Sequence, residues 1–151
     1  MGAFTVVRRA RIAADPARVH ALIDDFHAWR QWSPWEDVDP AMQREYSGPD
    51  AGEGAGYAWQ GNRKAGSGSM EITSSRADRI TIDLRFTRPF RADNDLVFEL
   101  VPAGEGTDVT WRMSGEQTGV WALLGKLMPM DRLVGKDFEK GLSRLASAAE
   151  S

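Results

Sequence analysis

The sequence predicts an α+β domain in which a curved antiparallel sheet of about seven strands wraps around a long C-terminal helix. Apolar and polar residues alternate near the N-terminus and again between about residues 41 and 118, which is the two-residue period of strands with one buried face. Glycine and proline separate these segments, as is typical of turns between antiparallel strands. After Gly119 the apolar residues follow a helical period, so one long helix is expected to close the chain.

Length and composition restrict the classes of protein that fit. With 151 residues the chain is expected to form a single domain over residues 1–151. The absence of cysteine excludes disulfides, thiolate zinc sites and a cysteine nucleophile, and with only two histidines we expect no metal and no other cofactor. A formal net charge of −3 argues against a nucleic-acid partner, which normally requires a basic face. The N-terminus lacks signal-peptide features and no stretch approaches eighteen apolar residues, so we expect a cytoplasmic protein without integral membrane association.

The first elements follow from alternation and from helix start signals. Residues 4–14 alternate as a strand does, and Asp15 followed by Pro16 then gives an N-cap and a proline at the first helical position. A helix of about three turns is expected there. Residues 27–32 are expected to form a second short helix that ends before Pro34, because the residue preceding a proline disfavours helical conformation. The apolar face of the first helix is expected to consist of Val19, Leu22, Ile23 and Phe26.

The middle of the chain predicts about six strands in succession. The clearest is residues 79–86, RITIDLRF, in which large apolar side chains alternate with charged and polar ones. Strands joined by short turns pair antiparallel and leave one face wet and one face buried. The glycine-rich stretches 52–56 and 61–67 are expected to be hairpin turns, because neither has the spacing of a phosphate-binding loop.

The terminal helix has to cover the apolar face of the sheet, because the two short helices are too small to do so. A curved sheet touches such a helix along one line and stands away from it elsewhere. The sequence therefore predicts a space between sheet and helix that is lined by inward-facing side chains. The apolar stripe of the terminal helix is expected to consist of Val134, Phe138, Leu142, Leu145 and Ala149.

Three of the six tryptophans lie within residues 29–35, WRQWSPW. If residues 27–32 are helical, Trp29 and Trp32 lie one turn apart on one face, and Pro34 redirects Trp35. Each indole can bury roughly 150–250 Å² of surface. The cluster fits two roles that the sequence leaves open: a structural plug at one end of the space, or a wall in which Trp32 or Trp35 also touches a ligand.

Five stretches carry a resemblance to a known family. They are WSPWEDVDPAMQREYSGPDAGEGAGYAWQGN, GSGSMEI, FTRPF, GTDVTWRM and MDRLVGKDFEKGLSRL. Together they run from Trp32 to Leu145 and resemble the polyketide cyclase/dehydrase-like branch of the START-type helix-grip superfamily (SRPBCC), which includes pollen-allergen-like proteins. The resemblance implies a helix-grip fold. The superfamily includes ligand carriers, lipid-transfer domains, aromatic polyketide cyclases and chaperone activators, and it has no shared catalytic signature.

The leading functional hypothesis is binding of a hydrophobic or lipid-like small molecule in the cavity between the curved sheet and the C-terminal helix. The alternative is an enzyme of the polyketide cyclase/dehydratase type, in which the same cavity would fold a reactive chain and orient its carbonyls. A protein-interaction module with a solid interior is a third class. No catalytic constellation is visible, so the sequence assigns no catalytic residue and leaves enzymatic activity open. A homodimer is compatible with each hypothesis.

The candidate site residues are of two kinds. Arg88, Gln117 and Asn62 are polar residues that could orient a ligand, whereas the acidic run at 36–39 is expected to be a solvated loop that holds no cation. The other kind consists of large apolar side chains that face the expected cavity. This predicted lining comprises Trp32, Trp35, Tyr57, Trp59, Met70, Ile82, Leu84, Phe86, Phe98, Trp111, Met113, Trp121 and Phe138.

Overall fold

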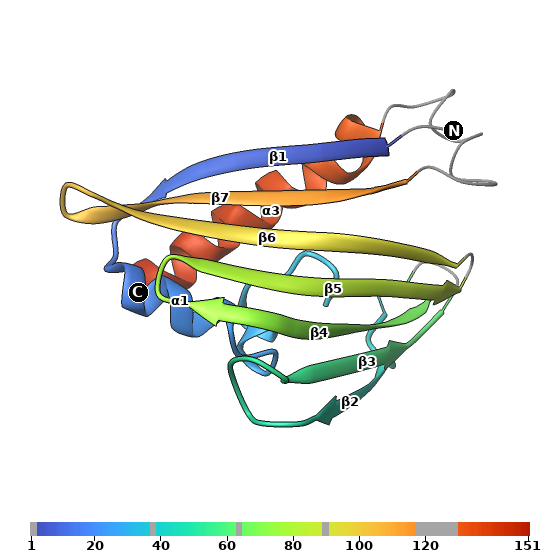
Figure 1. Ribbon diagram of the computed structural model, residues 1–151. Helices are drawn as coiled ribbons and strands as arrows, with labels where there is room; N and C mark the ends of the chain where they lie inside the picture. The colour runs from blue at the N-terminus through green and yellow to red at the C-terminus, as the bar shows by residue number, and fades with distance from the viewer. Residues whose placement is uncertain (1–2, 37–38, 63–64, 89–90, 117–129) are drawn as a thin grey trace.

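The computed structural model of the chain describes residues 3–36, 39–62, 65–88, 91–116 and 130–151. Seven strands form one antiparallel sheet in the order β1-β7-β6-β5-β4-β3-β2, which confirms the predicted α+β class and the sheet of about seven strands (Figure 1). Two short helices follow the first strand, as predicted. The elements are β1 (Ala3–Ile12), α1 (Pro16–Ile23), the 3₁₀-helix η1 (Ala28–Gln31), β2 (Gln43–Ser47), β3 (Gly56–Gln60), β4 (Ser67–Arg76), β5 (Arg79–Arg88), β6 (Ala92–Ala103), β7 (Gly106–Glu116) and α3 (Met130–Glu150).

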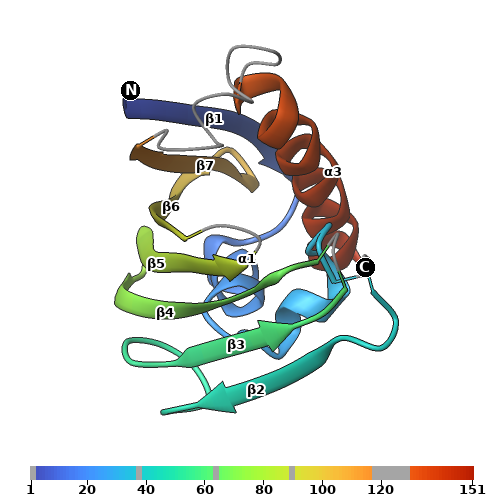
Figure 2. The same cartoon turned by 90° about the vertical axis from the view of Figure 1, so that its right-hand side faces the viewer.

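The sheet is curved, and α3 lies across its concave side (Figure 2). We call this side of the sheet the inner face. The pairing of β4 with β5 shifts register between Ser67 and Gly68 and again between Ile72 and Ser74. Such irregularities bend a strand and increase its twist, so they contribute to the curvature.

The N-terminal strand is held between β7 and the terminal helix. Val6 and Ile12 are fully buried on the inner face of β1, as the alternation predicted. Arg8, on the same face, forms an ion pair with Glu139 of α3, with 2.8 Å between Nε and Oε2. Its guanidinium occupies the space that a side chain at Gly135 would need. Glycine at this position therefore lets α3 approach β1 closely.

The two short helices are shorter than predicted. Helix α1 has eight residues instead of about three turns, and it ends where the backbone N–H of Asp24 donates to the carbonyl of His20. Asp15 occupies the N-cap position, but its side chain makes no capping hydrogen bond. The second helix is a single 3₁₀ turn, Ala28–Gln31. The predicted apolar residues Val19, Leu22, Ile23 and Phe26 are all buried.

Helix α3 presents the predicted stripe to the sheet. Phe138, Leu142, Leu145 and Ala149 are buried, and Val134 is partly buried against the same core. The stretch 120–128, which the sequence predicts to be helical, lies outside the described residues. Across the described ranges, no helix combines the length and the apolar character needed to cross a membrane.

Candidate functional site

The inner face is tightly packed beneath the middle of α3. The ring of Trp111 on β7 stacks on Phe138 of α3, with centroids 4.0 Å apart and an interplanar angle of 5°, and on Phe98 of β6 at 4.9 Å. All three side chains are fully buried. Gly141 lies directly over the Trp111 ring, because a Cβ atom there would be 2.8 Å from Cζ3. No space for a ligand separates sheet and helix at these rings.

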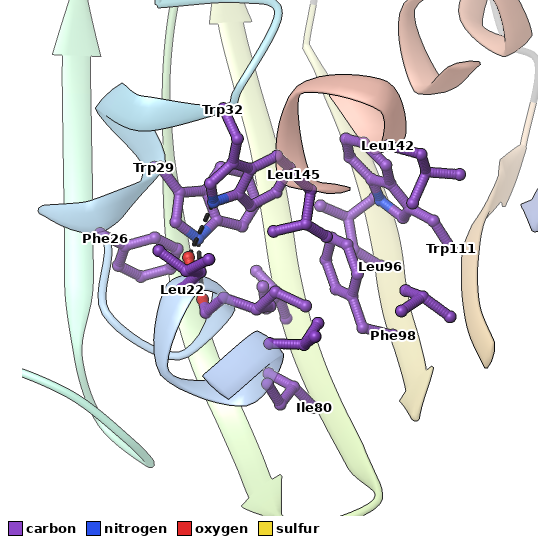
Figure 3. Close-up of a cluster of buried hydrophobic side chains, with 14 of the residues drawn as sticks. Leu22, Phe26, Trp29, Trp32, Ile80, Leu96, Phe98, Trp111, Leu142 and Leu145 are labelled. Carbon is purple, nitrogen blue, oxygen red and sulfur yellow. Dashed lines mark hydrogen bonds between the residues drawn. The ribbon is translucent and has the colours of Figure 1, made fainter. Parts of the chain in front are cut away.

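Trp29 and Trp32 have a structural role that their spacing alone did not reveal. The indole N–H of Trp29 donates to the carbonyl of Ile23, and that of Trp32 to the carbonyl of Leu22, each at 2.7 Å (Figure 3). These carbonyls belong to the last turn of α1, where a helix lacks its own hydrogen-bond donors. The two indoles therefore satisfy the end of α1 and pack it against the aromatic core.

Trp35 differs from the other two tryptophans of its cluster because it is only partly buried. Its indole N–H donates to Asp137 of α3 at 3.1 Å. Its ring contacts Trp111 and Phe138 edge-on, with centroids 5.7 and 6.1 Å away. Trp35 thus lies at the margin of the sealed core and joins the 29–35 segment to the terminal helix.

The inner face is less completely covered over β3, β4 and β5. Trp59 and Phe86 are only partly buried, although both point to the same side as the core. Their rings meet edge to face at 5.7 Å, and the Trp59 ring lies over Gly68, where a Cβ atom would be 2.7 Å from Cη2. Tyr57, Met70 and Leu84 continue the same surface across the sheet in direct register. We call these residues, Tyr57, Trp59, Met70, Leu84 and Phe86, the β3–β5 apolar surface.

A buried amide lies beside this surface. Asn94 is 5% exposed and follows Leu84 in register on the inner face, with Gly115 of β7 on its other side. The other two buried polar residues of the described chain are satisfied: Ser33 accepts from the backbone of Trp35, and Thr107 donates to a carbonyl at 2.8 Å. The Asn94 side chain makes no hydrogen bond with any described residue.

A polar cluster occupies the inner face over β2 and β3. The hydroxyl of Tyr57 donates to Oε2 of Glu36 at 3.0 Å, and Nε of Arg44 lies 3.4 Å from Oε1. The side chains of Glu36 and Arg44 are only 8% and 15% exposed. The predicted solvated loop is therefore wrong at Glu36, because an inward-facing arginine and a tyrosine of the sheet neutralise and bind this carboxylate. Burial, followed by the charge of Glu36 and the hydrogen bond to it, raises the pKa of Tyr57 above its usual range.

The raised pKa of Tyr57 predicts a defined pH dependence. At pH 7 the variant Tyr57→Phe should have a free energy of unfolding lower by about 1.5–3 kcal/mol, because it loses a hydrogen bond to a charged group. Above about pH 10 an unfolded tyrosine ionises while native Tyr57 stays protonated, so the wild type loses stability as pH rises. Urea denaturation of both proteins should therefore show a difference that shrinks above pH 10. A difference that stays constant over this range would contradict the raised pKa.

Of the predicted polar residues, the two that the structure describes, Arg88 and Asn62, are exposed and do not join this inner face. Arg88 is exposed at the end of β5. Asn62 is exposed in the turn between β3 and β4, where its Oδ1 accepts from the backbone of Ala65 at 3.0 Å. Gln117 and Trp121 lie outside the described residues. The sequence analysis did not predict that Glu36 and Asn94 lie on the inner face. For Asn94 the sequence does contain a signal, because Asn94 has the same strand parity as Leu96 and the inward-facing apolar residues that follow.

The predicted apolar lining divides into three groups by exposure. Five residues are fully buried in the core: Trp32, Ile82, Phe98, Trp111 and Phe138. Four are almost fully buried: Tyr57, Met70, Leu84 and Met113. The remaining three that the structure describes are partly exposed: Trp35, Trp59 and Phe86.

A separate small pocket lies near the turn between β2 and β3. Phe26, His27, Tyr46 and Pro49 contribute to its wall, and it is partly open to solvent. Its volume is about 80 Å³, whereas small-molecule sites are usually roughly 300–1,000 Å³. In the part of the chain that the structure describes, no three histidine, aspartate or glutamate side chains converge as metal ligands.

Comparisons with solved structures identify the same architecture in other proteins. Protein CV1439 from Chromobacterium violaceum matches with a TM-score of 0.69 at 18% identity, covering 97% of this chain and 98% of that chain. TTHA0849 from Thermus thermophilus matches with a TM-score of 0.68 at 19% identity, covering 97% of each chain. Ara h 8.0201 matches with a TM-score of 0.62 at 15% identity, covering 99% of this chain and 96% of that chain. At these identities the likeness establishes the fold alone.

The family is established by sequence. No curated protein matches the chain significantly in an overall sequence comparison. The family model described as polyketide cyclase / dehydrase and lipid transport, however, matches residues 3–150. The match covers nearly the whole chain and agrees with the curved sheet, the terminal helix and the short helices after the first strand. The protein therefore belongs to the polyketide cyclase / dehydrase and lipid transport family and has the helix-grip fold of the SRPBCC superfamily.

Proposed function

We propose that the protein binds a hydrophobic small molecule between the inner face of the sheet and α3, against the β3–β5 apolar surface. The observation that carries this proposal is the partial exposure of Trp59 and Phe86 on the face that is otherwise the core. Large aromatic side chains on an inner face are normally sealed, as Trp111 is. A ligand that covers these rings would gain the hydrophobic stabilisation that the protein's own side chains leave unused.

The arrangement restricts where the ligand lies. The stacked rings of Phe98, Trp111 and Phe138 exclude it from the middle of α3. Trp35 and Val134 are the larger of the partly buried apolar side chains on the helix side of the core, where Ala146 and Ala148 are also partly buried, so they are the candidates for the opposite wall. The family description includes lipid transport, which supports an apolar ligand.

Binding of N-phenyl-1-naphthylamine, a neutral dye that fluoresces in apolar surroundings, tests the proposal. We expect saturable binding to the wild type and about tenfold weaker binding to Phe86→Ala, because roughly 50 Å² of lost apolar contact corresponds to about 1.3 kcal/mol. The matched control is Val101→Ala, which removes an apolar side chain that is 55% exposed on the outer face. Equal loss of affinity in both variants, or no saturable binding to the wild type, would refute the proposal.

The enzymatic alternative is a cyclase or dehydratase acting in the same place. It is supported by the hydrogen-bonded pair of Tyr57 and Glu36 beside the apolar surface, since such a pair can exchange a proton with a substrate. Among solved structures, DynU16, a protein of the dynemicin biosynthetic locus, matches 97% of this chain over 47% of its own length. The raised pKa of Tyr57 makes its hydroxyl a weak acid at neutral pH, which favours binding over catalysis. If the wild type turns over a poly-β-ketone substrate and Tyr57→Phe does not, catalysis would be preferred over binding.

A further inference from the structure

Asn94 is a largely buried residue whose side-chain amide forms no hydrogen bond with the residues that the structure describes. A side-chain amide can donate two hydrogen bonds and accept two. The residue as a whole is 5% exposed, and its amide has no protein partner among the described residues that would compete with a ligand. The amide atoms of Asn94 are not among the fully enclosed side-chain atoms that lack a partner, so the amide keeps a small contact with solvent, and a ligand group that displaces this water can pair with it.

The position of Asn94 connects it with the proposed ligand site. Leu84 lies beside it on β5, and through Leu84 the same row of the inner face continues to Met70 and Tyr57. These three residues belong to the β3–β5 apolar surface. Asn94 therefore lies at the border of that surface, in direct register with it.

On the β7 side of Asn94, the absence of a side chain leaves room for the Asn94 amide. Gly115 is its partner on β7, and a Cβ atom at this glycine would overlap Oδ1 of Asn94. The next residue in the row is Phe4 of β1, which is partly buried and apolar. The amide thus lies over a glycine between apolar neighbours, and none of these neighbours offers a side-chain hydrogen bond.

The surroundings of Asn94 also determine which ligand groups fit. The inward-facing side chains of β5, β6 and β7 around it are uncharged, for example Leu84, Leu96 and Met113. A carboxylate or ammonium brought to this place would find no counter-charge on these strands, which is strongly unfavourable for a buried charge. A carbonyl or hydroxyl oxygen would instead pair with the amide without a net charge.

We propose that Asn94 recognises an uncharged oxygen of the ligand, so that the protein selects apolar ketones, phenols or alcohols over hydrocarbons of the same shape and over carboxylates. This inference rests on the proposed binding of a hydrophobic molecule to the β3–β5 apolar surface. It adds the one polar contact that sets the chemical class of the ligand.

Matched naphthalene probes test the selection by isothermal titration calorimetry. They are 2-acetylnaphthalene, 2-isopropenylnaphthalene, which has the same shape without the oxygen, and 2-naphthoate. The wild type should bind the ketone about tenfold more tightly than the hydrocarbon, and the naphthoate more weakly than either. In Asn94→Leu the ratio between ketone and hydrocarbon should fall to about one. The matched control Gln60→Leu replaces an exposed amide on the outer face and should keep the wild-type ratio.

The possible results separate the two proposals. If the wild type binds both ketone and hydrocarbon but the ratio survives in Asn94→Leu, Asn94 recognition is overturned while the proposed function stands. If the wild type binds neither probe, the proposed function is refuted, and the inference with it. Should Asn94→Leu not fold, the side-chain amide signals of Asn94 in the ¹⁵N-labelled wild type decide: they should shift clearly further with the ketone than with the hydrocarbon, which has the same ring but no hydrogen-bond acceptor. Equal shifts with both probes would overturn the inference.

Discussion

Replacing Trp111 by alanine is expected to lower the free energy of unfolding by about 3–5 kcal/mol, the usual cost of removing a fully buried large aromatic side chain. Trp111 is 0% exposed and lies between Phe98 and Phe138, so the variant would lose two stacked contacts and leave a large cavity. The surrounding rings come from β6 and α3, whose backbones are fixed by their own hydrogen bonds, so little of the cavity can collapse. Urea denaturation followed by circular dichroism would measure the loss.

The variant Trp111→Phe gives a sharper comparison at the same position. The indole N–H of Trp111 is buried and makes no hydrogen bond in the described chain, so phenylalanine removes ring volume without removing a polar contact. We therefore expect a clearly smaller loss than for alanine. Val101→Ala, at an exposed position of the outer face, should change stability by less than about 0.5 kcal/mol. A loss below about 1 kcal/mol for Trp111→Ala would contradict a sealed aromatic core.

Replacing Glu36 by alanine is the second change with a large expected effect, again about 3–5 kcal/mol of unfolding free energy. The variant leaves the largely buried guanidinium of Arg44 with only the backbone carbonyls of Met42 and residue 36 as acceptors and no counter-charge from Glu36, and it removes the acceptor of the Tyr57 hydroxyl. Removing one partner of a buried ion pair costs more than removing both, because a lone charge remains in a medium of low polarity. Thermal or urea denaturation of the wild type and of Glu36→Ala measures the loss of unfolding free energy.

A double-mutant cycle identifies the ion pair as the cause. The double variant Glu36→Leu/Arg44→Leu should recover a large part of the stability lost in Glu36→Leu, because no unpaired charge is then buried. Glu45→Ala serves as the matched control, since this carboxylate is on β2 next to Arg44 but exposed, and it should cost less than about 0.5 kcal/mol. Losses that simply add in the double variant would show that Glu36 and Arg44 act independently.

The two polar features of the inner face have different consequences for function. Glu36, Arg44 and Tyr57 hold one another, so their cluster fixes β2, β3 and the 32–36 segment in place at one border of the β3–β5 apolar surface. Asn94 at the other border has no such partner among the described residues and remains available to a ligand. A ligand that lies between these borders would therefore contact the Glu36–Arg44–Tyr57 cluster, whose charges are already paired, on one side and the Asn94 amide on the other.

The sequence determined the elements, their order and the family. The two-residue period at residues 79–86 and the helical period after residue 130 each depend on one face being buried, and that information is local. The sequence also determined which side of the strands with clear alternation faces inward, because Val6, Ile82, Phe98 and Trp111 lie on the inner face as their alternation predicts. The pairing of β1 with β7 was not predicted and is seen only in the tertiary structure, because the two strands are far apart in the sequence.

Only the tertiary structure decided which inward residues are sealed and which are partly exposed. Trp111 and Trp59 are the same residue type and both occupy inward positions in the alternation of their strands. Phe138 of α3 covers Trp111, however, whereas Trp59 remains partly exposed. Likewise Glu36 reads as part of an acidic loop until Arg44 and Tyr57, from strands further along the chain, bind it. The physical reason is that a period along the chain states which face a side chain occupies, whereas its burial, its partners and its pKa depend on what packs over that face from elsewhere in the sequence.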